Sequence, residues 1–384
     1  MPDKTPPSTT PSPRLRRVAA VVAAIALVAS GALVATPALS SLRGDVDISV
    51  RKDVKDLTSA EKAEIVAAIL AAKATPSPFN PSISYYDQFV AWHRQAFKCS
   101  LGWNQGGNWA GAAHNSPIFL PWHREFLLQF EHMLRTVSGD PTLAVPYWDW
   151  TDPESTAAVF ADDFMGGNGD PSQSYAVTTG PFRKGAWKLT IQDPAALTKG
   201  SVQPKSYLVR NFGAFPAGSV DLPTQEQVLE TIGVHRYDHK PYNAQSPIDQ
   251  SMRNTLEGWR DAKVASCDSG WIDQSQEPGS AHVMHNVVHL WVGGVWEEGG
   301  KDAEGTMAYN TSPNDPVFFF HHANVDRVWA AWEVTTGGRY RPQSGAPEGF
   351  NGNNTMWPWY NRTINSLFGT ERNGYRYASL PGVS

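Results

Sequence analysis

Cysteine is nearly absent from this chain of 384 residues, which contains only Cys99 and Cys267. Two thiols 168 positions apart cannot form the paired-cysteine motif of a structural zinc site, which excludes that class. Charged residues are also few, at 18%, whereas 41% are apolar, which argues against disorder beyond about the first 20 positions. The net charge is −5 and no large basic patch is present, so nucleic acid is not an expected partner.

Long hydrophobic runs are absent apart from one near the N-terminus. Three arginines between positions 14 and 17 precede an apolar run from Val18 to Leu33, which small residues and Pro37 follow. This order is typical of a secretory signal, and the length of the run also allows an uncleaved anchor. We therefore expect residues 1–41 to be a signal peptide or an N-terminal membrane anchor. The protein is then exported, either secreted or anchored on the extracytoplasmic side, where a disulfide between the two cysteines is the simplest expectation.

Helical periodicity dominates the rest of the chain. It predicts helices over residues 57–74, 83–97, 224–232, 281–292 and 318–335, and one within residues 114–137 that begins near Pro121. Thr58 and Glu61 form a capping box at the first of these. Long loops separate the helices, with short β-like pieces such as residues 187–191 (WKLTI). Because neither a repeat nor a linker divides the chain, we expect one mainly α domain over residues 42–384.

The eleven histidines are unevenly distributed. Three lie between positions 93 and 123, and five lie between 282 and 322, in or beside the predicted apolar helices. His285 and His289 are four residues apart, so both imidazoles project from one helix face and can chelate one ion. Two partly buried, hydrogen-bonded histidines are the alternative. Zinc-protease chemistry is excluded because Asn286 occupies the position of the general base in an HExxH motif.

The residues absent from these histidine groups restrict the metal. Neither group contains a cysteine, which blue copper sites need, or the spaced glutamates of di-iron sites. Ligands that are all imidazoles suit copper, or catalytic zinc with three histidines. Two groups of at least three histidines indicate a pair of metals, and two copper ions facing each other can bind O2 between them.

Several motifs resemble those of a known family. The segments "HNSPIFLPWHREFLLQFE" (114–131), "HNVVHLWVGG" (285–294) and "SPNDPVFFFHHANVDRVWAAW" (312–332) resemble the two copper-binding regions of tyrosinases and catechol oxidases, the type 3 copper proteins. The resemblance continues in order through "VPYWDW" (145–150), "GPF" (180–182), "RNTLEGWR" (253–260) and "GYRY" (374–377). It implies a bacterial-type catalytic core, in which an antiparallel four-helix bundle holds two copper ions.

The same resemblance implies three histidine ligands for each copper. They are His93, His114 and His123 for the first ion, and His285, His289 and His322 for the second. The family places its last ligand four residues before an aspartate, and Asp326 is four residues after His322. Asp326 then either orients this imidazole or forms a salt bridge with an arginine. His321 is expected to be a hydrogen-bonded neighbour of the site.

The reaction implied by the resemblance is oxidation of o-diphenols to o-quinones, with O2 reduced to water, and monophenols are a further candidate substrate. An o-aminophenol oxidase would use the same dicopper site on an amine-bearing ring. A protein of another class, a haemocyanin-like carrier, would bind O2 reversibly.

Four more residues are candidates through the resemblance. In the family, the residue after the first ligand of the second copper and a nearby glutamate hold a water that deprotonates the phenol. Here the first residue is Asn286, and the glutamate is Glu257 or Glu277. Glu257 matches the "LEGW" motif and is favoured, whereas Glu277 lies eight positions before the first ligand. Tyr309 occupies the position over the copper entrance, where a bulky side chain would favour slender phenols.

Some relatives carry a thioether between a cysteine and the ligand equivalent to His114. Cys99 has no clear counterpart in that pattern, so the Cys99–Cys267 disulfide remains our expectation.

Overall fold

The computed structural model describes residues 48–97, 113–192, 204–258 apart from 217 and 244, and 284–383. The N-terminal segment, both cysteines and Glu277 lie outside the described residues, so the predictions that rest on them are not addressed. Among the described helices, none combines the length and the apolar character needed to cross a membrane.

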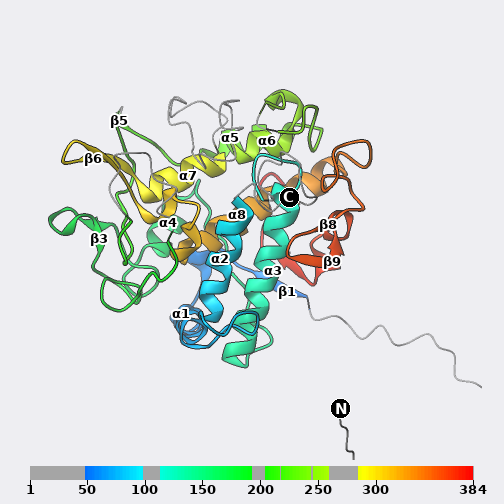
Figure 1. Cartoon of the computed structure of the whole chain (residues 1–384). Coiled ribbons are helices and arrows are strands. Elements are labelled where there is room, and N and C mark those ends of the chain that lie inside the picture. Colours follow the sequence, from blue (N-terminus) through cyan, green and yellow to red (C-terminus); the bar gives the residue numbers. More distant parts are fainter. Residues whose placement is uncertain are drawn as a thin grey trace, which may run out of the picture. The chain divides into compact units, whose positions relative to one another are not determined.

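Four helices form the centre of the fold (Figure 1). They are α2 (Tyr85–Phe97), α3 (Phe119–Ser138), α7 (Met284–Gly293) and α8 (Val317–Thr336). The rings of Phe130 and Phe319 stack 3.4 Å apart, which joins α3 to α8 in the apolar core. The predicted fold class, a mainly α protein built on an antiparallel four-helix bundle, is confirmed.

Further helices surround this bundle. α1 (Ser59–Ala74) packs on α2 and α3, α5 (Gln225–Gly233) packs on α8, and α6 (Met252–Glu257) packs on α7. The short α4 spans Pro153–Val159. The predicted capping box at α1 is present, because the Thr58 hydroxyl accepts from the Glu61 amide and the Glu61 carboxylate accepts from the Thr58 amide.

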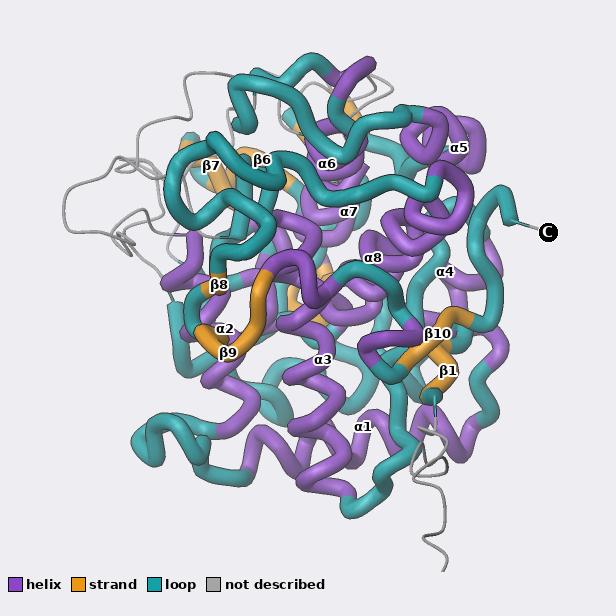
Figure 2. Tube along the Cα trace, turned by 90° about the vertical axis from the view of Figure 1, so that its right-hand side faces the viewer, coloured by secondary structure: helices purple, strands orange, loops and turns teal. Residues whose placement is uncertain are grey.

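The described strands form five two-stranded pairs, which Figure 2 shows as short orange segments beside the helices. β1 (Ser49–Arg51) pairs in parallel with β10 (Tyr375–Tyr377), which joins the two ends of the described chain. The other pairs are antiparallel: β2 (Gly169–Asp170) with β3 (Ala176–Val177), β4 (Ala214–Phe215) with β5 (Gly218–Ser219), β6 (Val295–Glu298) with β7 (Lys301–Glu304), and β8 (Thr355–Met356) with β9 (Trp359–Thr363).

The strand predicted over residues 187–191 is wrong. Trp187 and Leu189 are buried whereas Lys188 is exposed, so the alternation that suggested a strand is real. However, the Trp187 indole donates to the Asn314 carbonyl, and this segment forms no ladder with a neighbouring strand. The alternation reflects an extended segment packed on the core.

A buried ionic cluster ties the bundle to the terminal strands. The Asp326 carboxylate on α8 accepts from Arg51 of β1 at 3.1 Å and from Arg124 of α3 at 2.6 Å. The hydroxyls of Tyr375 and Tyr377 donate to the same carboxylate at 2.6 and 2.5 Å. Asp326 therefore has a structural role, and the suggestion that it orients a ligand imidazole is wrong.

Candidate metal centre

The first histidine group lies where α2, α3 and the loop before α3 meet. His93 comes from α2, His123 from the first turns of α3, and His114 from the preceding loop. The ring centroids lie 5.1 Å (His93–His114), 5.0 Å (His114–His123) and 5.7 Å (His93–His123) apart. All three side chains are buried, so they form one compact imidazole cluster.

The second group lies between α7 and α8. The Nε2 atoms of His285 and His289 are 3.1 Å apart, and each is 3.3 Å from Nε2 of His322. Three nitrogens around one ion in a tetrahedral arrangement are separated by about 3.3 Å when the metal–nitrogen distance is roughly 2.0–2.1 Å. The spacing of these nitrogens therefore fits three ligands of a single ion.

Carbonyl and amide oxygens fix the tautomers of most of these imidazoles. In each case Nδ1–H donates to an oxygen, which leaves the Nε2 lone pair for another use. The pairs are His93 with the Asn310 carbonyl (2.7 Å), His123 with the Phe119 carbonyl (2.9 Å), His285 with the Asn286 side-chain oxygen (2.7 Å) and His289 with the Met307 carbonyl (2.8 Å).

Burial keeps these histidines neutral. It lowers the pKa of His93 to about 3 and that of His289 to about 4, and it lowers the pKa values of the other members below the usual range. Neutral imidazoles whose Nε2 lone pairs converge cannot satisfy one another by hydrogen bonds alone. A cation held by the lone pairs satisfies all of them, and ligands that are all imidazoles suit copper.

The two groups face each other across a shared space. The rings of His123 and His322 stack with centroids 4.3 Å apart at 16°, and those of His114 and His285 lie 6.0 Å apart. The ring of Phe318 stacks on that of His322, with the ring centroids 4.0 Å apart. The site is therefore a dinuclear one, lined by apolar rings.

His321 also lies in this region. Its ring stacks on that of His285, with centroids 5.1 Å apart at 18°, and it approaches Trp150 at 5.2 Å. Within the described residues, neither ring nitrogen forms a hydrogen bond of normal geometry, although the nearby His285 backbone offsets part of the lowering of the His321 pKa by burial. His321 is the neighbour that the sequence predicts, but ring stacking holds it more than hydrogen bonding.

Glu257 is fully buried at the end of α6, next to the loop that carries His114. Its carboxylate accepts from the Asn115 amide at 2.6 Å and from the Arg253 guanidinium at 3.0 Å. Burial raises the pKa of Glu257 to about 7, against the lowering effect of Arg253. A solvated surface glutamate, the alternative for this position, is thereby excluded.

Asp238 is a second carboxylate that pairs with Arg253, the partner of Glu257. It is buried and pairs with the Arg253 guanidinium at 2.9 Å. The four-residue step from Arg253 to Glu257 could have indicated their pairing. Nothing in the sequence indicates Asp238.

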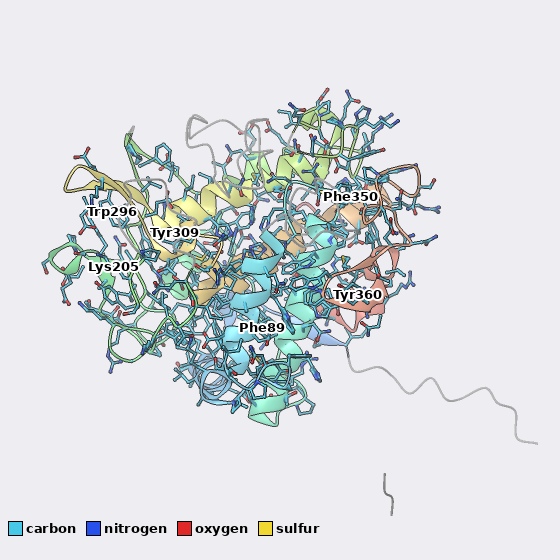
Figure 3. The ribbon with its side chains drawn as sticks, in the orientation of Figure 1. Phe89, Lys205, Trp296, Tyr309, Phe350 and Tyr360 are labelled. Atoms are coloured by element: carbon cyan, nitrogen blue, oxygen red, sulfur yellow. The ribbon has the colours of Figure 1, made fainter. Side chains whose placement is uncertain are left out.

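Tyr309 lies between β7 and α8 and is labelled in Figure 3. It is partly exposed, and its hydroxyl donates to the Glu304 carbonyl at 3.2 Å. Burial of the ring raises its pKa above the usual value, so the phenol stays protonated. It follows Met307, whose carbonyl orients His289, by two positions, which places it on the segment bordering the second group.

Three other histidines lie away from both groups. His132 and His235 are exposed and His239 is half-buried, and His282 lies outside the described residues. The sequence did not reveal the carbonyls of Asn310 and Met307 as orienting groups, because any residue supplies a carbonyl.

Comparison with known proteins identifies the family. The chain matches the common central domain of tyrosinase over residues 83–335. The tyrosinase of Streptomyces lincolnensis is 35% identical over 317 residues, which cover 82% of this chain and 93% of that protein. The grixazone synthase of Streptomyces griseus is 36% identical over 330 residues, which cover 82% and 95%. A polyphenol oxidase structure from Thermothelomyces thermophila, 22% identical, shares the fold with a TM-score of 0.55 and covers 87% of this chain and 89% of that one. The chain belongs to the tyrosinase family of copper oxidoreductases, and its two histidine groups fit the dinuclear copper centre of that family.

Proposed function

We propose that this protein oxidises o-diphenols to o-quinones, with O2 reduced to water, and that it also hydroxylates monophenols. Two diphenols then give two quinones and two waters for each O2. The observation that carries this proposal is the pair of facing histidine groups, whose Nε2 lone pairs converge in a buried, aromatic-lined space. A bound copper pair would supply the electron transfer between phenol and O2.

The proposed ligands are the six histidines named from the sequence. His322 rather than His321 completes the second group, because its Nε2 lies 3.3 Å from the Nε2 atoms of both His285 and His289. His321, stacked on His285, then acts as packing that fixes the orientation of that ring.

The chain also provides a route for the phenol proton. Asn286 accepts from Nδ1–H of His285, so its amide NH2 is directed elsewhere and can hold a water. Glu257, on α6 packed against α7, is the proposed acceptor of the proton from that water. Its pKa of about 7 suits a group that must gain and lose a proton near neutral pH.

We further propose that the protein acts outside the cytoplasm. The arginine cluster followed by an apolar run within residues 1–41 supports export, by cleavage of a signal or as an anchored form. Oxidising surroundings would also suit the Cys99–Cys267 disulfide.

The test is O2 uptake by copper-reconstituted protein, measured in parallel with tyrosine, catechol and o-aminophenol. We expect uptake with catechol and, after a lag or at a lower rate, with tyrosine. Turnover of o-aminophenol alone would replace the proposal with an aminophenol oxidase. Reversible O2 binding without consumption of any phenol would indicate a carrier.

A further inference from the structure

A pocket of about 600 Å³ lies outside the copper site and is lined by the loop after α5 and the loop after α8. It is lined by residues 235–240, Tyr242, residues 337–339 and Arg341. Gly337 is 15 residues beyond His322 along α8, which corresponds to about 22 Å of helical rise. The pocket is therefore separate from the metal centre.

The lining of this pocket is cationic. Arg236, Lys240, Arg339 and Arg341 are all exposed around it, and none of them forms an ion pair with any residue that the structure describes. The one carboxylate in the lining is Asp238, which is buried and already paired with an internal arginine. Four cations against one neutralised carboxylate give a strongly positive pocket on a chain whose net charge is −5.

The floor of the pocket is fixed in place. Tyr237 is buried, and its hydroxyl donates to the Pro117 carbonyl at 2.6 Å, while its ring packs on Tyr340 at 5.0 Å. Asp238 accepts from the Ser251 hydroxyl at 2.7 Å. A floor held by such contacts needs little reorganisation when a ligand binds, which favours affinity.

We propose that this pocket binds a small polyanion, a molecule carrying two or more phosphate or carboxylate groups. Like charges gathered around one cavity repel each other, and an anion between them removes that repulsion. Arginine guanidinium groups bind the oxygens of phosphate and carboxylate in a two-pronged manner, and three of the four cations are arginines. The volume suits a ligand of ordinary metabolite size.

Calorimetric titration of the copper-loaded full chain with inorganic pyrophosphate and, separately, with citrate tests this proposal. The informative variant is Arg339→Gln with Arg341→Gln. Its matched control is Arg372→Gln with Arg376→Gln, which removes the same charge from two exposed arginines outside the pocket. Heat from contact of either probe with copper is common to all three proteins and cancels in the comparison. An unchanged unfolding temperature shows that each variant is folded.

We expect saturable binding to the wild type and to the control variant. The dissociation constant of the Arg339→Gln, Arg341→Gln variant should be at least tenfold larger. The tighter probe then assigns the ligand to the phosphate or the carboxylate class. Equal dissociation constants in all three proteins, or no saturable binding of either probe to the wild type, would overturn the proposal.

Discussion

The two adjacent histidines of α8 have different surroundings, although both are fully buried. His322 meets the Nε2 atoms of two other histidines, whereas His321 stacks flat on one of their rings. A metal ligand needs its lone pair directed at the ion, and the two Nε2 contacts of His322 favour it for this role, although a nitrogen of His321 also lies within 4.8 Å of those of the other three histidines.

A matched pair of substitutions tests this difference. His322→Gln should lower the copper content from two ions to about one per chain and abolish O2 uptake, since the second ion loses a third of its ligands. His321→Gln should keep two ions, with at most a modest change in rate. Metal analysis of the purified variants measures this, and equal copper loss from both would contradict the assignment.

Glu257 has an unusual environment for a carboxylate, because it is fully buried beside an arginine and its pKa is raised to about 7. Below that pH the group is increasingly protonated and cannot accept a proton. Monophenol hydroxylation should therefore fall as the pH drops through 7, while oxidation of catechol should change less.

The variant Glu257→Gln should lose about a hundredfold in monophenol hydroxylation, the lower range of what a general base contributes. Catechol oxidation should stay within a fewfold of the wild type, and copper content should be unchanged. The ratio of initial rates on tyrosine and catechol between pH 5.5 and 8.5, values chosen to bracket the pKa of about 7, is the measurement. A variant with the same ratio and pH profile as the wild type would remove Glu257 from the mechanism.

At the scale of elements, the longer helices could be predicted from the sequence because each has a buried apolar face or a capping residue, as at Thr58 of α1. The short helices α4 and α6 were missed, because one or two turns are too few to show a helical period. The extended segment near Trp187 was wrongly predicted to be a strand. Its buried and exposed side chains alternate because the segment packs on the core, and it does not pair with a strand. Of the two roles expected for Asp326, the salt bridge with an arginine is confirmed, but the sequence did not indicate which arginines take part. Those partners, Arg51 and Arg124, are far away in sequence, and no local pattern identifies them.

In the metal site too, local sequence patterns could be predicted, whereas contacts between distant segments could not. Histidine spacing and the family motifs indicated six of the seven imidazoles in the two groups as ligands, and His321, the seventh, as their neighbour. The loop carbonyls that orient them could not be predicted, because the path of the Met307–Asn310 loop depends on how α7 and α8 pack. Asp238 was missed for the same reason.

The contact between Asp326 and its two arginines joins α8, α3 and β1, so it should contribute to stability rather than to chemistry. Asp326→Asn removes one of the two carboxylates that pair with each buried guanidinium, while Glu131 still pairs with Arg51 and Glu333 with Arg124. We therefore expect a loss of about 3 kcal/mol in the free energy of unfolding, the lower end of the range for breaking a buried pair. Asp163→Asn, at a carboxylate that is 59% exposed, is the control and should stay within about 0.5 kcal/mol. Urea unfolding of the copper-loaded proteins measures both, and a similar small loss in the two variants would contradict a structural role for the cluster.

The loop between β7 and α8 should control which substrates enter. Tyr309→Gly removes a ring from the segment whose Met307 and Asn310 carbonyls contact His289 and His93, so kcat/KM for a bulky catechol should rise about tenfold relative to catechol itself. Tyr309→Phe keeps the ring and loses only the hydrogen bond to the Glu304 carbonyl, so it should keep the original preference. Unchanged preference in the glycine variant would exclude Tyr309 as a gate.

At the scale of the whole molecule, histidines from α2, α3, α7, α8 and one loop meet only when the bundle is assembled. The copper site and the fold are therefore coupled, since ions bound by the assembled site stabilise the folded state over the unfolded one. Burying these neutral imidazoles together without ions costs free energy of folding. The stability of the fold should therefore depend on bound metal.

Elemental analysis of the reconstituted wild-type protein measures whether these imidazoles hold two copper ions. After removal of loosely bound metal, we expect two copper ions per chain, because each facing group offers at least three imidazole nitrogens. A stoichiometry of about one ion or fewer per folded chain would contradict it.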